Sequence, residues 1–279
     1  MAPIIFIKET ISMIKKNRKR FTILIFASLV FSSQLYAAED LSQTANDPTA
    51  PLMAMQLIDN YTSDFHNSLE GETANSVMFR AAYPYKWGET SHIARISQPY
   101  VTNTPSGDTG LADMTLFDMT VFPASWGRFG VGIVAGIPIA DDNKQWSLGP
   151  AVGFVNNTLA KGLNIGLFNQ NLFRVAGDDD RPDTSISSFQ PILNYSVGGG
   201  WNIGTGDIQY IYDWESSQWA SLPVGIQVGK LVKIGKVPTI LSLQYQYNFA
   251  DEVDIGNDLY APTAKSSLVF TFKFLFPTL

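Results

Sequence analysis

One stretch of the sequence decides the fold: residues 241–249, which read LSLQYQYNF. Large apolar residues take every second position, and small or polar residues take the positions between them. Successive side chains of a β-strand point to opposite faces, so this alternation predicts a strand with one apolar face and one polar face. Residues 265–276, which read KSSLVFTFKFLF, repeat the pattern near the end of the chain.

Outward from these two stretches, the chain from residue 54 divides into about twelve segments of this kind. Short and long connections alternate between them, and the long ones are 66–72, 102–110, 138–144, 176–183, 213–218 and 250–263. Bacterial outer-membrane barrels have short periplasmic turns and longer external loops. The sequence therefore predicts an all-β fold, an up-and-down transmembrane β-barrel of about 12 antiparallel strands with short periplasmic turns and long extracellular loops.

A soluble β-sandwich is the alternative, because its strands alternate in the same way. Its Greek-key connections give no reason for short and long loops to alternate. The tryptophans also favour a membrane barrel, since all of them fall at inferred strand ends: Trp87, Trp126 and Trp201 beside short turns, and Trp146, Trp214 and Trp219 beside long loops. Indole rings prefer the headgroup level of a bilayer, whereas a soluble core would hold them centrally.

The first 37 residues have the features of a secretory signal peptide. A basic leader is followed by an apolar run over residues 21–31 and then by small residues up to Ala37. This run is too short for a membrane-spanning helix, which needs roughly 20 apolar residues. We expect cleavage after Ala37, a periplasmic N-terminal segment over residues 38–53 and the barrel over residues 54–279. Translation from Met13 instead of Met1 would give a signal peptide of ordinary length.

Composition limits the partners and cofactors. Residues 38–279 carry 13 basic and 24 acidic residues, so the mature chain has a net charge near −11 and nucleic-acid binding is disfavoured. The chain has no cysteine, which excludes a cysteine lipid anchor, a disulfide framework and a thiolate metal site. We expect no cofactor. The expected partners are outer-membrane lipid and lipopolysaccharide, the barrel-assembly machinery and a small-molecule solute.

Enzymatic chemistry is not expected. The sequence has two histidines, His66 and His92. Ser91 and His92 are neighbours on an expected strand and therefore point to opposite faces, so they cannot form a nucleophile–base pair. The glycines at 198–200 lack the spacing and the following helix of a dinucleotide-binding loop, and they indicate a turn.

One acidic loop is a candidate metal site. Asp178, Asp179, Asp180 and Asp183 offer carboxylate oxygens that suit a divalent cation, with Arg181 as an internal counter-charge. The spacing is not that of an EF-hand. A solvated acidic loop is the competing interpretation.

The charged residues on the inward parity are the candidate pore lining: Arg80, Arg95, Asp118, Arg128, Arg174, Asp207, Lys265 and Lys273. They indicate either a lining that binds polar or anionic solutes or a salt-bridged plug that fills a narrow barrel. Eight strands leave an interior filled by side chains and sixteen leave an aqueous channel, so twelve strands predict an intermediate, narrow interior.

Several short motifs are spread over the chain from about Asp47 to Phe276: Ile96–Pro99, Gly110–Asp113, Trp146–Ala151, Ala176–Asp183, Gln190–Tyr195, Pro223–Gly225, Ile234–Pro238 and Phe274–Pro277. Through these motifs the chain resembles a family of bacterial outer-membrane proteins grouped under the MetA pathway of phenol degradation. Ala112 departs from the pattern, because a glycine is usual before the aspartate. The resemblance implies a barrel-forming, transport-related protein without a defined substrate.

Two functions remain open from the sequence. The first is a passive channel or transporter for small, organic or aromatic solutes in the cell outer membrane. The second is a closed structural or surface-interaction barrel whose acidic loops bridge divalent ions to lipopolysaccharide.

Overall fold

The structure is a computed structural model that describes residues 37–140, 144–178, 182–254 and 259–276. The expected signal peptide, residues 1–37, lies outside the described residues except for Ala37, where helix α2 (Ala37–Ala45) begins. Among the described residues, no helix is long and apolar enough to cross a membrane.

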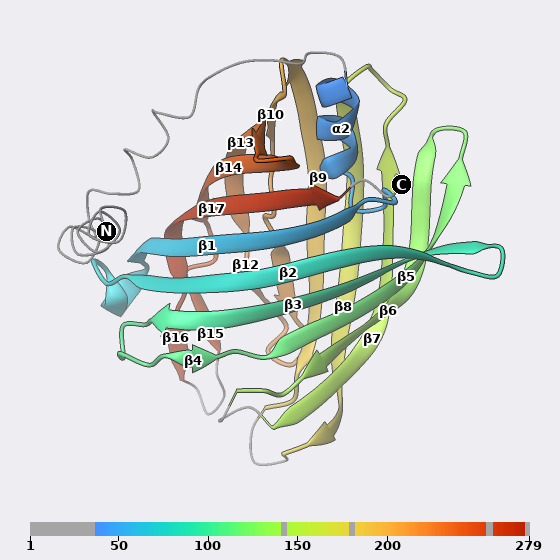
Figure 1. The fold of residues 1–279 in the computed structure, drawn as a ribbon. Helices are drawn as coiled ribbons and strands as arrows, with labels where there is room; N and C mark the ends of the chain where they lie inside the picture. The colour runs from blue at the N-terminus through green and yellow to red at the C-terminus, as the bar shows by residue number, and fades with distance from the viewer. Residues whose placement is uncertain (1–36, 141–143, 179–181, 255–258, 277–279) are drawn as a thin grey trace, which may run out of the picture. The chain divides into compact units, whose positions relative to one another are not determined.

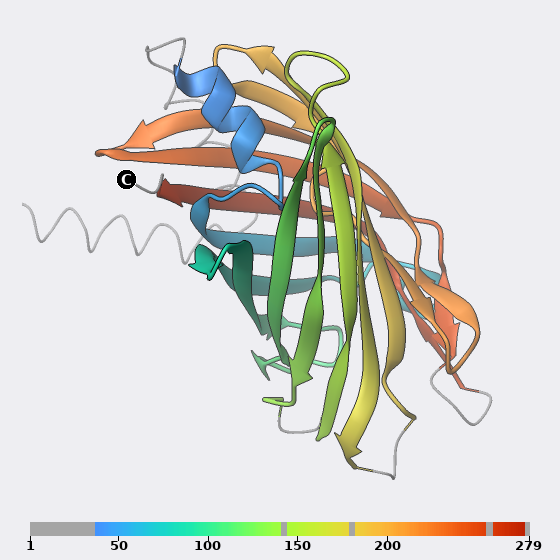
Figure 2. The same cartoon turned by 90° about the vertical axis from the view of Figure 1, so that its right-hand side faces the viewer.

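The described residues form a closed, antiparallel barrel of twelve strands (Figures 1 and 2), as the sequence predicts. Ten strands are β1 (Met53–Phe65), β2 (Ala74–Trp87), β3 (Thr90–Asn103), β5 (Met114–Ala124), β6 (Gly127–Ile137), β7 (Gln145–Asn156), β8 (Leu163–Gly177), β9 (Ser185–Gly198), β14 (Val237–Asn248) and β17 (Ala264–Phe276). Two strands are interrupted: β10 (Trp201–Gly204) continues as β11 (Tyr210–Asp213), and β12 (Gln218–Ser221) continues as β13 (Pro223–Ile234). First and last strands pair from Met53↔Phe276 to Phe65↔Ala264, which closes the barrel.

The alternation along the strands is confirmed by exposure. On β14, Leu243 is 40% exposed and Tyr245 is 48% exposed, whereas Gln244 between them is 2% exposed. On β17, Leu268 is exposed and Val269 and Leu275 are buried. The outer wall is therefore apolar, as in a barrel that spans lipid, while the inward face holds the polar residues together with a minority of buried apolar ones such as Val269 and Leu275.

The connections follow the predicted asymmetry. The β2–β3 and β13–β14 hairpins turn through two residues each, and Gly88 (φ +60°) and Gly235 (φ +62°) take the left-handed conformation that such turns need. The long connections lie at the opposite ends of the strands. They carry the small elements η2 (Asn67–Leu69), β4 (Gly110–Leu111), β15 (Glu252–Asp254) and β16 (Tyr260–Pro262).

The interruption between β10 and β11 turns the chain toward the interior. Gly206 lies in this break with φ +65°, and a Cβ at its position would overlap Oε1 of Gln244. Only glycine fits such close backbone approach in this conformation without strain. Asp207 follows directly, and its backbone N–H donates a hydrogen bond of 3.0 Å to Oε1 of Gln244 on β14. The break therefore sets the Asp207 carboxylate inside the barrel.

Candidate functional site in the barrel interior

The segment from Leu41 to Leu52, called here the N-terminal segment, lies inside the barrel toward the end with the short turns. This stretch falls within the expected periplasmic segment, residues 38–53. Strands β6, β8 and β17 hold it by polar contacts. Arg128 of β6 pairs with Asp47 at 2.5 Å, and Lys273 of β17 donates to the Ala45 carbonyl at 2.9 Å. Asn164 of β8 donates to the Gln43 carbonyl at 2.8 Å.

A second set of contacts fixes the local shape of the N-terminal segment. After α2 ends, Asp47 Oδ1 accepts hydrogen bonds from both the backbone N–H (2.8 Å) and the hydroxyl (2.5 Å) of Thr49. Ala45 packs with the buried Ile240 and Leu275 of the barrel wall. Burial raises the pKa of the Asp47 carboxyl above its ordinary value, although Thr49 and Arg128 act in the opposite direction. The segment thus carries a desolvated acid into the interior, with one arginine to balance it.

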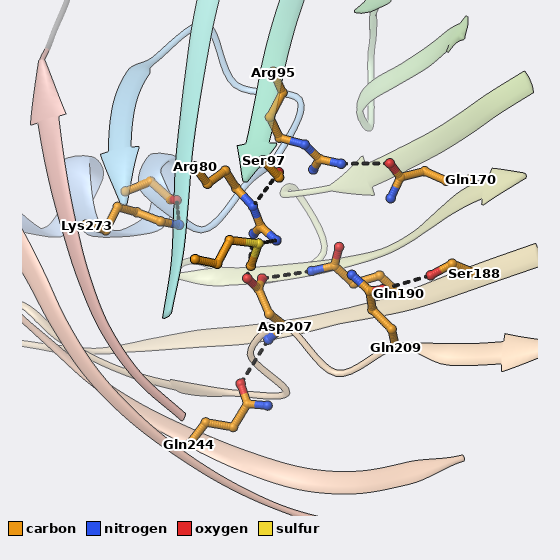
Figure 3. A network of polar contacts seen from close by, with 12 residues as sticks. Arg80, Arg95, Ser97, Gln170, Ser188, Gln190, Asp207, Gln209, Gln244 and Lys273 are labelled. Carbon is orange, nitrogen blue, oxygen red and sulfur yellow. Dashed lines mark hydrogen bonds and ion pairs between the residues drawn. The ribbon is translucent and has the colours of Figure 1, made fainter. Parts of the chain in front are cut away.

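An ion pair crosses the interior. Arg80 of β2 and Asp207 of the β10–β11 break meet with Nη1 and Oδ2 2.6 Å apart. Strands β13, β14, β17 and β1 separate these two positions around the wall. Gln190 of β9 donates a further hydrogen bond of 3.1 Å to Asp207 Oδ1, and Ser97 accepts one of 3.3 Å from Arg80 Nε (Figure 3). This bridge narrows the lumen from opposite sides.

A second arginine lies beside this bridge. Arg95 of β3 donates to Oε1 of Gln170 on β8 at 2.7 Å (Figure 3). Its guanidinium carbon lies 4.8 Å from the ring centre of Phe117 and 5.5 Å from that of Phe168, which is cation–π geometry. Gln170 is its one hydrogen-bond acceptor among the described residues, so most of its five N–H donors have no partner there.

A cavity of about 120 Å³ lies between the N-terminal segment and the bridge. Arg80, Arg95 and Lys273 line it on the basic side, and Asp47 and Asp207 line it on the acidic side. Asp47 is already paired with Arg128. The three cations therefore face one remaining carboxylate, and the apolar part of the wall includes Phe117, Phe168, Ile93, Ile192 and Ile240. An anion with an apolar body suits this lining, because uncompensated buried charge is costly.

The other expected lining residues lie near the two ends of the barrel or on the outer face of its wall. Arg174 pairs with Asp183 at 2.7 Å, and Lys265 pairs with Asp64 at 3.1 Å, both near the long loops. Asp118 is a correction. Its neighbours Phe117 and Met119 on β5 are buried in the interior cluster, so the Asp118 side chain lies on the outer face and does not line the pore.

The expected metal loop is described only in part, because Asp179 and Asp180 lie outside the described residues. Asp183 is engaged by Arg174. No group of three or more acidic or histidine side chains in the described part of the chain is arranged to hold a metal ion.

Sequence reasoning placed Gln244 on the inward face but named neither it nor Asp47, Gln170 and Gln190 as residues of this site. The three glutamines lie on inward parities of their strands, and this signal could have identified them as lining residues. No pattern in the sequence signals that Asp47 enters the lumen, because the segment before the first strand has no strand periodicity.

No family model matches the chain. No curated protein matches its sequence. Among solved structures, an outer membrane channel of the COG4313 group from Pseudomonas putida F1 is similar with a TM-score of 0.58 and 13% identity, over 81% of this chain and 96% of that chain. Outer membrane phospholipase A from Escherichia coli gives a TM-score of 0.44 and 10% identity, over 81% and 97%. The first likeness shows that the chain has the fold of an outer-membrane β-barrel channel.

Proposed function

We propose that this barrel is a channel for small organic solutes and that it holds anionic solutes at the cavity beside Arg95. The proposal rests on the cavity, in which three cations and an apolar wall surround a space closed by the N-terminal segment. A carboxylate or phenolate would take hydrogen bonds from Arg95, and its apolar body would lie against Phe117 and Phe168. Small-molecule sites commonly combine such apolar walls with a few convergent polar groups.

Passage through the barrel requires the N-terminal segment to move. It occupies the short-turn end, and the Arg80–Asp207 bridge narrows the lumen above it. Both barriers depend on side-chain contacts rather than on the strand ladder, so they can open without unfolding the wall. A solute that displaces Asp207 from Arg80 with its own carboxylate would open the bridge as it binds.

Two further points support this proposal. The fold is shared with an outer membrane channel, and the sequence motifs resemble the transport-related family of the MetA pathway. Delivery to the outer membrane would use the signal peptide and the barrel-assembly machinery, and the bilayer with its lipopolysaccharide would surround the wall.

Planar-bilayer recordings test the proposal. We expect discrete conductance steps, a reversal potential in a KCl gradient that favours anions, and a reduced chloride current when benzoate is added. Arg95→Gln should shift the reversal potential toward cations and weaken the benzoate effect about tenfold or more, because it removes a charge-assisted partner. Lys230→Gln is the matched control. Lys230 lies over the Trp201 ring at 4.7 Å, away from the cavity lining, so this change should alter neither property.

A closed structural barrel is the second candidate, because the Arg80–Asp207 bridge and the docked N-terminal segment also suit a permanently filled interior. Its external acidic loops would then bridge divalent ions to lipopolysaccharide. Wild-type protein that inserts into bilayers without conductance at any voltage would favour this candidate and contradict the channel.

A further inference from the structure

The outer wall carries a polar cluster that the channel does not use. It includes His92 on β3 and Asp118 on β5. Their neighbours along the chain, Ile93 on β3 and Phe117 and Met119 on β5, are buried in the interior, so His92 and Asp118 point outward by strand alternation. Tyr85 on β2 is directly opposite His92 in the ladder. A carboxylate on the outer wall of a barrel is costly, and an ionisable residue in that setting indicates a functional site.

The cluster has the geometry of a nucleophile, a base and an orienting acid. The Thr90 hydroxyl lies 2.8 Å from His92 Nε2, and His92 Nδ1 lies 3.2 Å from Asp118 Oδ1. Tyr85 donates a hydrogen bond of 2.6 Å to the second carboxylate oxygen, and its ring stacks on His92 with centroids 5.0 Å apart. A base within reach of a hydroxyl and held by a third group is the general signature of nucleophilic catalysis.

Sequence reasoning excluded Ser91 because it points away from His92, and it passed over Thr90. Thr90 is two positions from His92 and therefore shares its face. The hydroxyl also lies 2.7 Å from the Trp87 carbonyl, so its one proton has two acceptors. Since a carboxylate can only accept, Nδ1 of His92 carries a proton, and in the neutral imidazole Nε2 is then free to take the proton of Thr90.

The site lies where lipid esters are found. Thr90 is the first residue of β3, next to the short turn at Gly88, and Trp87 before that turn is 74% exposed. Exposed tryptophan at a strand end marks the headgroup level, and the short turns face the periplasm. The acyl esters of phospholipids in the periplasm-facing leaflet therefore reach Thr90, whereas soluble substrates in the lumen do not.

We propose that Thr90, His92 and Asp118 hydrolyse acyl esters of phospholipids at the outer wall of the barrel. Thr90 Oγ1 attacks the ester carbonyl carbon while its proton moves to His92 Nε2. The bond from carbonyl carbon to glycerol oxygen breaks, and His92 returns the proton to that oxygen, which releases a lysophospholipid. Water then attacks the acyl-threonine, with His92 taking its proton and passing it to Thr90, and the fatty acid leaves.

Backbone donors complete the arrangement. The backbone N–H groups of Gly88 and Glu89, in the turn before Thr90, have no acceptor in the described part of the chain and are the nearest donors along the chain for the carbonyl oxygen as it becomes an anion. Asp118 is a positioning residue, because it holds the imidazole in the tautomer that accepts from Thr90.

The test uses the full-length barrel, refolded in mixed micelles with a phosphatidylethanolamine, and follows fatty acid and lysophospholipid by mass spectrometry. Thr90→Ala and His92→Asn should each lower the rate about a thousandfold, and Thr90→Ser should retain it. Asp118→Asn should lower kcat while KM stays unchanged, which a merely structural role would not produce. A fluorophosphonate probe should label the peptide that contains Thr90.

Ser91→Ala is the matched control, since it changes a hydroxyl beside His92 on the opposite face and should leave the rate unchanged. Heat-modifiable gel migration confirms that each variant is folded. If His92→Asn fails to fold, the comparison of Thr90→Ala with Thr90→Ser still tests whether hydrolysis needs a hydroxyl at position 90. Equal rates for those two variants, or no hydrolysis by the folded wild-type barrel, would overturn the proposal.

Discussion

At the scale of single residues, inward charges are held by partners on other elements. Arg128 of β6 reaches Asp47 of the N-terminal segment, and Arg80 of β2 reaches Asp207 of the β10–β11 break. The Asp47 side chain is 2% exposed and that of Arg128 is 29% exposed. Loss of the arginine therefore leaves a buried carboxylate unpaired, which costs more than loss of both charges.

This asymmetry predicts the behaviour of the N-terminal segment. Arg128→Met should weaken its docking by about 3 kcal/mol, whereas the double variant Arg128→Met with Asp47→Asn should recover most of that loss. The chain has no cysteine, so Ser42→Cys provides a single reporter at a fully buried position. Thiol labelling of Cys at this position should be slow in the parent, fast with Arg128→Met and slow again in the double variant.

The pH dependence follows from the raised pKa of Asp47. A raised pKa in the docked state means that docking favours the protonated acid, so docking strengthens as the pH falls through that pKa and weakens as it rises. Because the thiolate is the reactive form, acidification slows labelling of any cysteine, so the comparison is with the double variant Arg128→Met with Asp47→Asn, which has no acid at position 47. Acidification should slow labelling in Arg128→Met by a larger factor than in the double variant. An equal factor in the two would contradict this assignment.

The faces of β14 make a second residue-scale prediction. Tyr245 points outward and is 48% exposed, while Gln246 lies on the inward parity. Tyr245→Arg should destabilise the barrel by about 2 to 4 kcal/mol, because it places a charge toward hydrocarbon, and Gln246→Arg should cost less. Equilibrium unfolding in lipid vesicles of one composition compares the two. A larger loss for Gln246→Arg would mean that the polar face is not luminal.

At the scale of elements, the break between β10 and β11 is the feature that shapes the interior. A continuous strand would keep all its side chains on two regular faces. The break instead brings Asp207 within 2.6 Å of Arg80 on a distant strand and within reach of Gln190 and Gln244. The interruption removes a few backbone hydrogen bonds between neighbouring strands. In exchange it allows the Arg80–Asp207 ion pair, which a continuous strand would not form.

Two glycines with the same conformation test this element. Gly206→Ala and Gly235→Ala both add a Cβ at positive φ, +65° and +62°, and both should cost about 1 to 2 kcal/mol for that reason. Only the Cβ at 206 overlaps a neighbour, Gln244 Oε1, while 235 has open space. We expect Gly206→Ala to be the more destabilising in denaturant unfolding and to change channel conductance. Equal losses, with conductance unchanged, would show that the break is not tightly constrained.

At the scale of the whole molecule, the two ends of the barrel hold different sets of ion pairs. The short-turn end holds the N-terminal segment and the Arg128–Asp47 pair, and the long-loop end carries the Arg174–Asp183 and Lys265–Asp64 pairs. The cavity lies between them, and the polar cluster at Asp118 lies outside the wall. A solute path and a lipid site can therefore coexist without sharing residues.

Orientation in the outer membrane is a prediction at this scale. An epitope tag inserted after Gly107, in the long β3–β5 connection, should bind antibody on intact cells, and a tag after Lys161, in the short β7–β8 turn, should bind only after permeabilisation. Both sites are exposed, and Gly107 has open space around it. The reverse accessibility would show that the barrel has the opposite orientation, with the proposed lipid site in the outer leaflet.

The sequence by itself determined the strand positions, the closure and the two kinds of connection. Lipid on one side of the wall and a polar lumen on the other make apolar and polar residues alternate along a strand. This alternation can be recognised within a few consecutive residues, as in 241–249. Arg80, Arg95, Asp207 and Lys273 could be selected as inward residues for the same reason, and the structure places them around the cavity.

Only the tertiary structure decided which of these residues meet. Arg80 and Asp207 are 127 positions apart, and their contact depends on how many strands the barrel has and where β10 breaks. Asp118 was assigned to the wrong face because the inward residues of β5 are apolar, so polarity no longer distinguishes lumen from lipid there. The N-terminal segment has no period at all, and its place inside the barrel comes from contacts that exist only once the wall has closed.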